Sequence, residues 1–310
     1  MAETTTPSPV LDPTVTVEKR PLLAWLLLTC MALVWGSSFI MMKKALVVFT
    51  VQQVASGRIF FAFLFFLPFM VVQIRQAEVR QALRHRWLAL LGSGVLGFLI
   101  PAFLFAEAGA HISSALSGTL NSLSPLFVLL LGVLVFAQRF RANQVWGIML
   151  GFVGSLILVF FGGNGSFSVN GYALLVVLAT LMYGANTNLI AKYIAHLPAL
   201  VATPWTFAFI GPIAGVVLLS GDFISRATQP GVWEPLGAIL FLGILASGIT
   251  SVLFIRVVQL ASGVFAASVT YLIPVVAIVW GLFDGETIHV YQYLGLTISL
   301  AGIYLVNRQK

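Results

Sequence analysis

The sequence predicts an all-α integral membrane protein with ten transmembrane helices, arranged as two inverted-topology repeats of five helices each. Three observations predict this fold: the composition, a spacing of about 148 residues between matching features, and the distribution of Lys and Arg. Of the 310 residues, 60% are hydrophobic and only 8% are charged, whereas soluble domains carry about 25% charged residues. So few charges cannot provide a polar surface for a chain of this size, and lipid is the expected solvent.

The first apolar run begins after a polar N-terminal segment. Residues 1–21 are polar and rich in Pro, a composition that predicts a disordered cytoplasmic tail. The run from Leu22 to Met42 is too long for the core of a signal peptide, and Lys43 and Lys44 follow it instead of a small-residue cleavage site. We therefore expect this run to be the first span.

Ten apolar runs follow one another along the chain, each close to the roughly 20 residues that a helix needs to cross a bilayer. They lie at 22–42, 52–74, 87–107, 112–136, 144–162, 171–192, 199–219, 236–257, 263–283 and 290–307. Most connections between them are short. The two longest are 75–86, which is basic, and 220–235, which contains Gly and Pro; both are expected to be loops.

An internal repeat divides these runs into two sets of five. The matching pairs are Trp35-Gly36-Ser37-Ser38 with Tyr183-Gly184-Ala185-Asn186, Lys44 with Lys192, Pro125 with Pro274, Gly132 with Gly281, and Gln144, Gly147 and Gly154 with Gln292, Gly295 and Gly302. Because each copy holds an odd number of spans, the two copies should lie in opposite orientations in the membrane. We expect the first copy at 22–162 and the second at 163–310.

The orientation follows from Lys and Arg, which are enriched in cytoplasmic loops. If the N-terminus is cytoplasmic, twelve of these residues fall on the cytoplasmic side: Lys19, Arg20, Arg75, Arg80, Arg84, Arg86, Arg139, Arg141, Lys192, Arg256, Arg308 and Lys310. The opposite side holds only Lys43, Lys44 and Arg226. Both termini are therefore expected in the cytoplasm, which agrees with an even number of spans.

These features resemble the drug/metabolite transporter superfamily, in its ten-helix branch with two EamA-type repeats. The resemblance covers about 22–307 and is carried by the Trp35 to Phe39 segment, Arg58, Pro125, Pro274 and the run Gly285, Glu286, Gln292, Gly295 and Gly302. In the first repeat Gln138 stands where Glu286 stands in the second. The resemblance implies export or exchange of small metabolites, and the chain is similar to bacterial exporters of aromatic and other amino acids.

Polar residues inside the apolar runs are the candidate substrate-binding groups. Tyr183 and Asn186 share a helical face, as Trp35 and Ser38 do at the matching positions. The complete candidate set is Trp35, Ser38, Ser117, Asn121, Tyr183, Asn186, Asn188, Thr270 and Tyr271. Hydrogen bonding and close packing between helices remain the structural alternative for all of them.

Two prolines at matching positions, Pro125 and Pro274, are the candidate hinges. Proline within a helix leaves one backbone carbonyl without its donor, and lipid tolerates such a break only where protein or water satisfies it. Small and polar residues precede both prolines. We expect each proline to interrupt a central span and to allow bending during transport.

Arg58 lies about two turns into its predicted span, whereas Lys192 and Arg256 fall at the ends of theirs. A charge at this depth is costly unless it is paired or solvated. Glu107 is the nearest partner by predicted depth, so we expect a structural ion pair between Arg58 and Glu107. A carboxylate-binding role for Arg58 is the functional alternative.

The sequence also limits the classes of function. The four His residues have no metal-ligand spacing, so no metal or cofactor is expected. No Ser–His, paired Asp or His-rich set indicates an enzyme, and the basic residues form no surface for nucleic acid. We expect an inner-membrane secondary transporter that exports small metabolites, foremost neutral or aromatic amino acids, by alternating access; its partners are the substrate and lipid. A carrier of phosphorylated sugars or other metabolites, and a channel-like facilitator, are the alternatives.

Overall fold

The computed structural model describes residues 21–111, 117, 120–162, 171–273, 275–276 and 290–307, and these are almost entirely helical. The first half contains α1 (Pro21–Leu46), α2 (Val51–Gln73), α3 (Ala77–Gly94), η1 (Val95–Leu99), α4 (Ile100–His111), α6 (Ser124–Leu134) and α7 (Ala142–Gly162). The second half contains α8 (Gly171–Leu189), η2 (Ile190–Ile194), α9 (Ala199–Leu219), α10 (Phe223–Ala227), α11 (Trp233–Leu240), η3 (Phe241–Ile249), α12 (Thr250–Leu260), α13 (Gly263–Ala267), η4 (Ser268–Tyr271) and α15 (Val290–Asn307). Within the described ranges there is no β-strand.

Among the described residues, six helices are long and apolar enough to cross a membrane. They are Leu22–Leu46, Val51–Gln73, Ala77–His111, Gly171–Ile194, Ala199–Leu219 and Trp233–Leu260. Helices α6, α7, α13 with η4, and α15 lie in the four remaining predicted ranges. The structure thus confirms a multi-pass all-α protein, and the count of ten spans stays a prediction.

Three predicted boundaries differ from the structure. The basic segment 75–86 is not a long loop, because α3 begins at Ala77 and continues through η1 into α4 as one helix of 35 residues. The connection 220–235 contains the short helix α10. Where a regular helix was predicted at 263–283, the described part begins with the short α-helix α13, continues in the 3₁₀ turn η4 and is helical again at 273 and 275–276.

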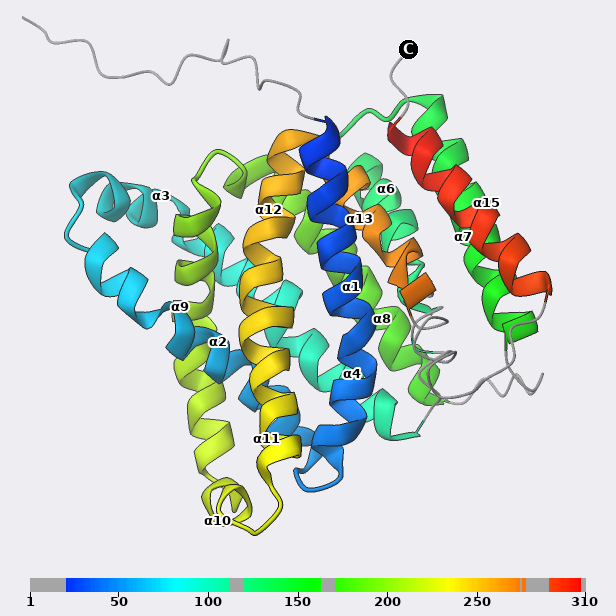
Figure 1. The fold of residues 1–310 in the computed structure, drawn as a ribbon. Coiled ribbons are helices and arrows are strands. Elements are labelled where there is room, and N and C mark those ends of the chain that lie inside the picture. The colour runs from blue at the N-terminus through cyan, green and yellow to red at the C-terminus, as the bar shows by residue number, and fades with distance from the viewer. Residues whose placement is uncertain are drawn as a thin grey trace, which may run out of the picture.

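The helices of the two halves pack mainly against each other (Figure 1). Helix α2 lies along α9, and α7 lies along α15. Helix α1 contacts α11, η3 and α12, while α8 contacts η1 and α4, which are the corresponding parts of the other half. Helices α2 and α9 begin 148 residues apart, and so do α7 and α15. The packing therefore follows the spacing of the sequence repeat.

Both long central helices contain a π-helical segment at a similar place. Segment η1 divides α3 from α4, and η3 divides α11 from α12. Pro101 lies two residues after η1 and has no backbone N–H, so the carbonyl of Gly97 loses its usual helical donor. Such π segments widen the helix locally and are common at functional sites.

Glycines bring α7 and α15 into backbone contact. A Cβ added to Gly147 would lie 2.7 Å from the carbonyl oxygen of Gly302 and 2.7 Å from the backbone nitrogen of Val306. A Cβ added to Gly154 would lie 2.7 Å from the carbonyl oxygen of Gly295. Small residues permit this close approach, which is the usual way that helices associate in lipid.

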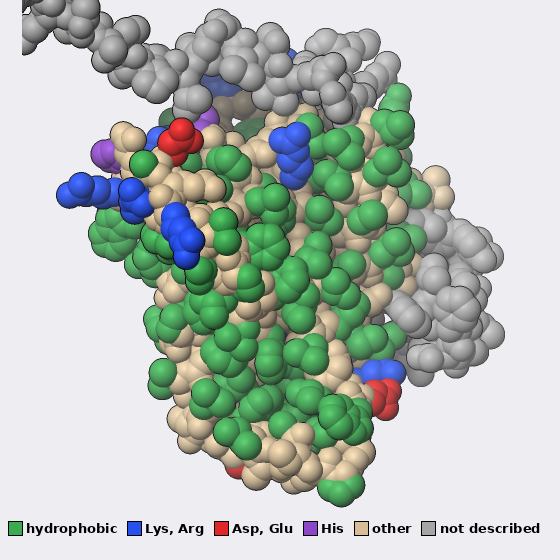
Figure 2. Space-filling view, turned by 60° about the vertical axis from the view of Figure 1, so that its left-hand side comes forward, with side chains coloured by type: hydrophobic (Ala, Val, Ile, Leu, Met, Phe, Trp, Pro, Cys, Tyr) green, Lys and Arg blue, Asp and Glu red, His purple; other side chains and the backbone are tan. Residues whose placement is uncertain are grey.

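The surface is suited to a bilayer. Large apolar side chains face outward on most helices, including Leu33 on α1, Val216 on α9 and Leu174 on α8. Cys30 of α1 also faces outward. Figure 2 shows a broad apolar face with Lys and Arg gathered toward its upper end. Helix α3 lies at that end, as do the first residue of α1 and the last residue of α15 (Figure 1).

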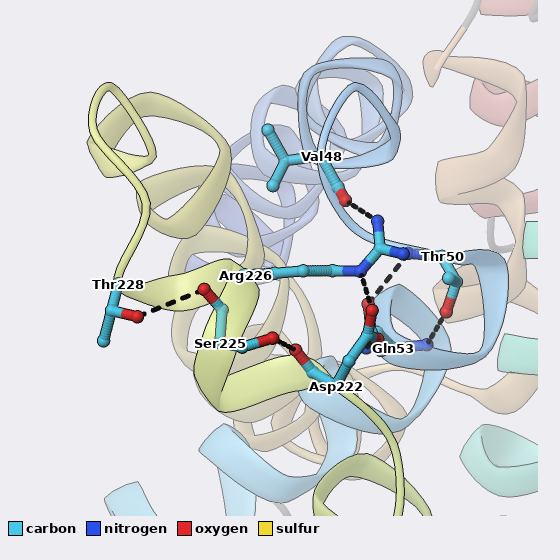
Figure 3. A network of polar contacts seen from close by, with 7 residues as sticks. All are labelled: Val48, Thr50, Gln53, Asp222, Ser225, Arg226 and Thr228. Atoms are coloured by element: carbon cyan, nitrogen blue, oxygen red, sulfur yellow. Dashed lines mark hydrogen bonds and ion pairs between the residues drawn. The ribbon is translucent and has the colours of Figure 1, made fainter.

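A polar network joins three helices at the opposite end (Figure 3). Arg226 of α10 donates to Asp222 Oδ2 at 2.7 Å and to the Val48 carbonyl, after the end of α1, at 2.6 Å. Gln53 of α2 donates to Asp222 Oδ1 at 2.7 Å, and Thr50 caps α2 through Gln53. These donors, Arg226 first and then Gln53, hold the pKa of Asp222 below its ordinary value.

Candidate functional site

A cavity of about 160 Å³ lies between the two halves. Its walls come mainly from α1, α2, α3, η1 and α4 of the first half and from α8, α9, η3, α12 and η4 of the second. Apolar and aromatic side chains form most of the wall, and a few polar groups interrupt it. That composition is typical of sites that bind small organic molecules.

Six of the nine predicted substrate-binding residues line this cavity: Trp35, Ser38, Asn121, Tyr183, Asn186 and Thr270. They come from four different helical segments that lie far apart in the sequence. Because Trp35 and Ser38 match Tyr183 and Asn186 in the repeat, the two halves place equivalent residues on the same cavity.

The other three predicted residues are buried in helix packing. Asn188 donates to the carbonyls of Val128 at 2.8 Å and of Gly184 at 2.9 Å, so its amide ties α8 to α6. The Tyr271 hydroxyl donates to the Ile148 carbonyl on α7 at 3.0 Å. Ser117 is buried, and its hydroxyl has no hydrogen-bond partner among the described residues. Asn188 and Tyr271 therefore form hydrogen bonds between helices, which is the structural alternative to substrate binding.

The cavity residues of α1 and α8 meet the π-helical segments. The Trp35 indole Nε1 donates to the carbonyl of Ala246 in η3 at 2.8 Å, which satisfies a carbonyl in the irregular ladder. On the other side, Asn186 packs so closely on Gly97 of η1 that a Cβ at that glycine would collide with its amide. The Asn186 Oδ1 atom is buried and has no partner among the described residues.

Arg58 lines the cavity and is not paired with Glu107 among the described residues. Its Nε donates to the Ser247 hydroxyl of η3 at 3.0 Å. Glu107 instead lies 3.7 Å from His111 Nδ1, one helical turn away on α4. The predicted depth of Glu107 in its span suggested it as the partner, but the packing of α2 on η3 brings Ser247 to Arg58 instead.

Several cavity residues were not predicted from the sequence. They are Ser93, Gly97, Thr203, Thr206, Ser247 and Ser251, with Phe39, Met42, Phe98, Leu242, Phe254 and Ile255 as apolar partners. The feature of the sequence that could have indicated them is the recurrence of small and polar residues within predicted spans three, seven and eight. Isolated Ser and Thr are common in membrane helices, because their hydroxyls bond to the carbonyl four residues earlier, and this reduces the value of the signal.

The two candidate hinges have different outcomes. Pro125 lies in the first turn of α6, directly after a turn at Ser122 and Leu123, and its role as a hinge stays a prediction. Proline is well tolerated there, since the first turn of a helix has no internal partner for its N–H groups. Pro274 lies outside the described residues.

Within the described ranges, no group of three or more His, Cys, Asp or Glu side chains is arranged to hold a metal ion.

With this geometry established, comparison with known proteins is informative. Residues 22–160 and 170–308 each match the EamA-like transporter family. A protein from Bacillus subtilis described as the uncharacterized transporter YxxF is 29% identical over 256 residues, which is 79% of this chain and 78% of that protein. A probable terminal-alkyne amino-acid exporter from Streptantibioticus cattleyicolor is 24% identical over 70% of this chain and 71% of its own length.

A plant protein and a solved structure extend the comparison. A WAT1-related chloroplastic protein of Arabidopsis thaliana is 25% identical over 92% of this chain and 69% of its own length. A crystal structure with 17% sequence identity superposes with a TM-score of 0.66 and covers 91% of this chain and 95% of that one. At that identity the likeness is one of fold.

Proposed function

Since this chain belongs to the EamA-like transporter family, we propose that it exports small metabolites, foremost neutral or aromatic amino acids, across the inner membrane of a bacterium. The protein is a multi-pass membrane transporter rather than an enzyme, as the members of this family are transporters. The proposal of amino acids as substrates takes support from the cavity and from a relative described as a probable terminal-alkyne amino-acid exporter.

The cavity between the halves is the observation that carries this proposal. A volume of about 160 Å³ accommodates roughly ten water-sized groups, which matches the non-hydrogen atoms of a medium-sized amino acid. Aromatic and aliphatic walls suit an apolar side chain, and the polar groups of Arg58, Asn186 and Ser247 suit the charged end. One cationic residue among the described lining residues favours an amino acid over a sugar phosphate, which carries two negative charges.

The transport mechanism proposed is alternating access. The two copies would exchange conformations about a pseudo-two-fold axis in the membrane plane, so that the cavity opens to each side in turn. The basic end with α3 and both described termini would face the cytoplasm, in agreement with the excess of Lys and Arg. Bending near Pro125 and Pro274 remains part of the proposal; at Pro125 the turn that precedes α6 would be the moving element.

Reconstitution into liposomes tests this function. We expect saturable uptake of labelled neutral or aromatic amino acids, and acceleration of that uptake by unlabelled substrate on the opposite side. Uptake that rises linearly with concentration and shows no such counterflow would indicate a channel-like facilitator. Uptake of sugar phosphates without amino acids would contradict the proposed substrate class.

A further inference from the structure

Arg58 keeps most of its hydrogen-bonding capacity unused in the cavity wall. A guanidinium has five N–H donors. One of them, on Nε, reaches Ser247, and no described residue accepts from the other four. No carboxylate forms an ion pair with Arg58 among the described residues. The Ser247 hydroxyl accepts from Arg58, which leaves its own proton available to donate to a ligand.

This arrangement is costly without a ligand. A charge within a membrane span destabilises the protein unless it is solvated or paired, and breaking up such a pair leaves an uncompensated charge. A planar guanidinium binds a carboxylate through two parallel hydrogen bonds. A carboxylate between Arg58 and Ser247 would therefore satisfy several donors and supply the missing negative charge.

The repeat places this charge on one side of the cavity. Thr206 lies 148 residues after Arg58, and both residues line the cavity from α2 and α9. The Thr206 hydroxyl donates to the Ala202 carbonyl of its own helix at 2.9 Å. The second copy has no charge at the equivalent position, and Arg58 is the one Arg or Lys among the described lining residues.

A second polar group faces the same space from α8. Asn186 is only 6% exposed, and its Oδ1 is an acceptor without a described partner. Such a buried acceptor is destabilising until a donor reaches it. An ammonium or amide N–H of a ligand would provide that donor.

We propose that Arg58 and Ser247 bind the carboxylate of the transported molecule and that Asn186 accepts from its N–H groups. The cavity then takes zwitterions and monocarboxylates and rejects amines that have no carboxylate. This inference rests on the proposed transport function and specifies how its substrate is held.

Matched ligands test the inference directly. The probes are L-phenylalanine, 3-phenylpropionate and 2-phenylethylamine, with a second aliphatic set of leucine, 4-methylpentanoate and isopentylamine. Binding to the purified full chain is measured by the shift of its unfolding temperature and by titration calorimetry. We expect each carboxylate to bind about 10- to 100-fold more tightly than the amine of the same skeleton.

Three variants identify the residue responsible. Arg58→Gln should remove the preference for carboxylates, and Arg58→Lys should retain part of it. Arg256→Gln is the matched control, because Arg256 is an exposed residue of α12 that does not line the cavity. The carboxylate preference of this variant should equal that of the wild type. Size-exclusion chromatography and unfolding temperature establish that each variant is folded.

The outcomes separate this inference from the proposed function. If no carboxylate binds the wild type more tightly than its matched amine, the carboxylate site is wrong, whatever is transported. If folded Arg58→Gln keeps the wild-type preference, Arg58 is not the anchor. If carboxylates bind preferentially but liposomes take up no amino acid, the carboxylate site at Arg58 is supported and the proposed substrate class is wrong.

Discussion

Two asparagines on α8, Asn186 and Asn188, show how neighbouring positions take different roles. Asn186 faces the cavity with an acceptor that has no described partner, while Asn188 donates to two carbonyls. The repeat in the sequence drew attention to both. Only the packing of α8 against η1 and α6 distinguishes them, because that packing turns one side chain to the cavity and the other to a helix interface.

Alanine substitution should separate these two roles. We expect Asn186→Ala to lower the rate of transport at least tenfold while the unfolding temperature stays constant or rises, since an unpaired buried acceptor is removed. Tyr183→Ala should also impair transport more than folding, although it loses the stacking of Tyr183 on Phe105. Transport kinetics and thermal unfolding in detergent provide the measurement; normal transport by well-expressed variants would exclude both residues from the site.

The companion substitution has the opposite signature. Asn188→Ala should destabilise the protein by about 1–3 kcal/mol, because the hydrogen bond that joins α8 to α6 inside the membrane is lost. Substrate affinity of the remaining folded protein should stay close to that of the wild type. A loss of affinity without a loss of stability would show that Asn188 contacts the substrate.

At the level of helices, the apolar runs predicted most of the architecture. Long runs become long helices because lipid leaves no other partner for backbone N–H and C=O groups. The sequence did not predict that α3 starts at Ala77, because its first turns are basic and lie at the edge of the membrane. It also missed the π segments, which depend on Pro101 and on contacts between Trp35 and η3 that only the packed structure contains.

The candidate site was predicted only in part, because some of its residues follow from the sequence repeat and others depend on how distant helices pack. Repeat symmetry identified Trp35, Ser38, Tyr183 and Asn186, which depend on local position in α1 and α8. The partner of Arg58 was not predicted, because the relative depth of α2 and η3 depends on how two distant segments pack. Ser247 carries no mark in the sequence that distinguishes it from Ser251.

The glycine contact between α7 and α15 makes a prediction about stability. Gly302→Val should destabilise the protein by about 1–3 kcal/mol, because the added carbons meet backbone atoms of α7. The control is Gly237→Ala on α11, where an added Cβ meets nothing within 4 Å and should stabilise by about 0.5–1 kcal/mol through helix propensity. Thermal unfolding in detergent measures both; equal effects of the two changes would contradict the close contact.

The network around α10 predicts a dependence on pH. Since the pKa of Asp222 is lowered in the folded protein, the carboxylate stabilises the fold above its ordinary pKa of 3.8, and that contribution is lost as the pH falls below this value toward the lowered one. Wild type should therefore unfold at a higher temperature than Asp222→Asn at pH 7, and the difference should shrink in acid. If the difference in unfolding temperature between wild type and Asp222→Asn is unchanged at pH 3, Asp222 stabilises the fold through packing and neutral hydrogen bonds rather than through its charge.

At the scale of the whole molecule, the opposite orientation of the two copies is testable by labelling. Lys44 and Lys192 occupy matching positions, and both are exposed. In a Cys30→Ser background, Lys44→Cys should react with a membrane-impermeant maleimide from outside, and Lys192→Cys only in inside-out vesicles. Labelling of both cysteines from one side would show that the copies are parallel. A reporter fused at residue 310 tests the cytoplasmic C-terminus in the same cells.

The interlocking of the two halves has a consequence for biosynthesis. The most extensive helix contacts, α7 with α15 and α2 with α9, all join a segment made early to one made late. A ribosome adds the intervening 148 residues in about 7–30 s at typical rates. During that interval the faces of the first copy that later pack on the second are exposed to lipid. Arg58 then lies in the bilayer before Ser247 has been synthesised. Insertion factors and membrane proteases are therefore expected to act on the first copy before the second is synthesised. A substitution that destabilises the first copy alone should then lower the yield of folded transporter by more than its effect on the stability of the complete protein would indicate.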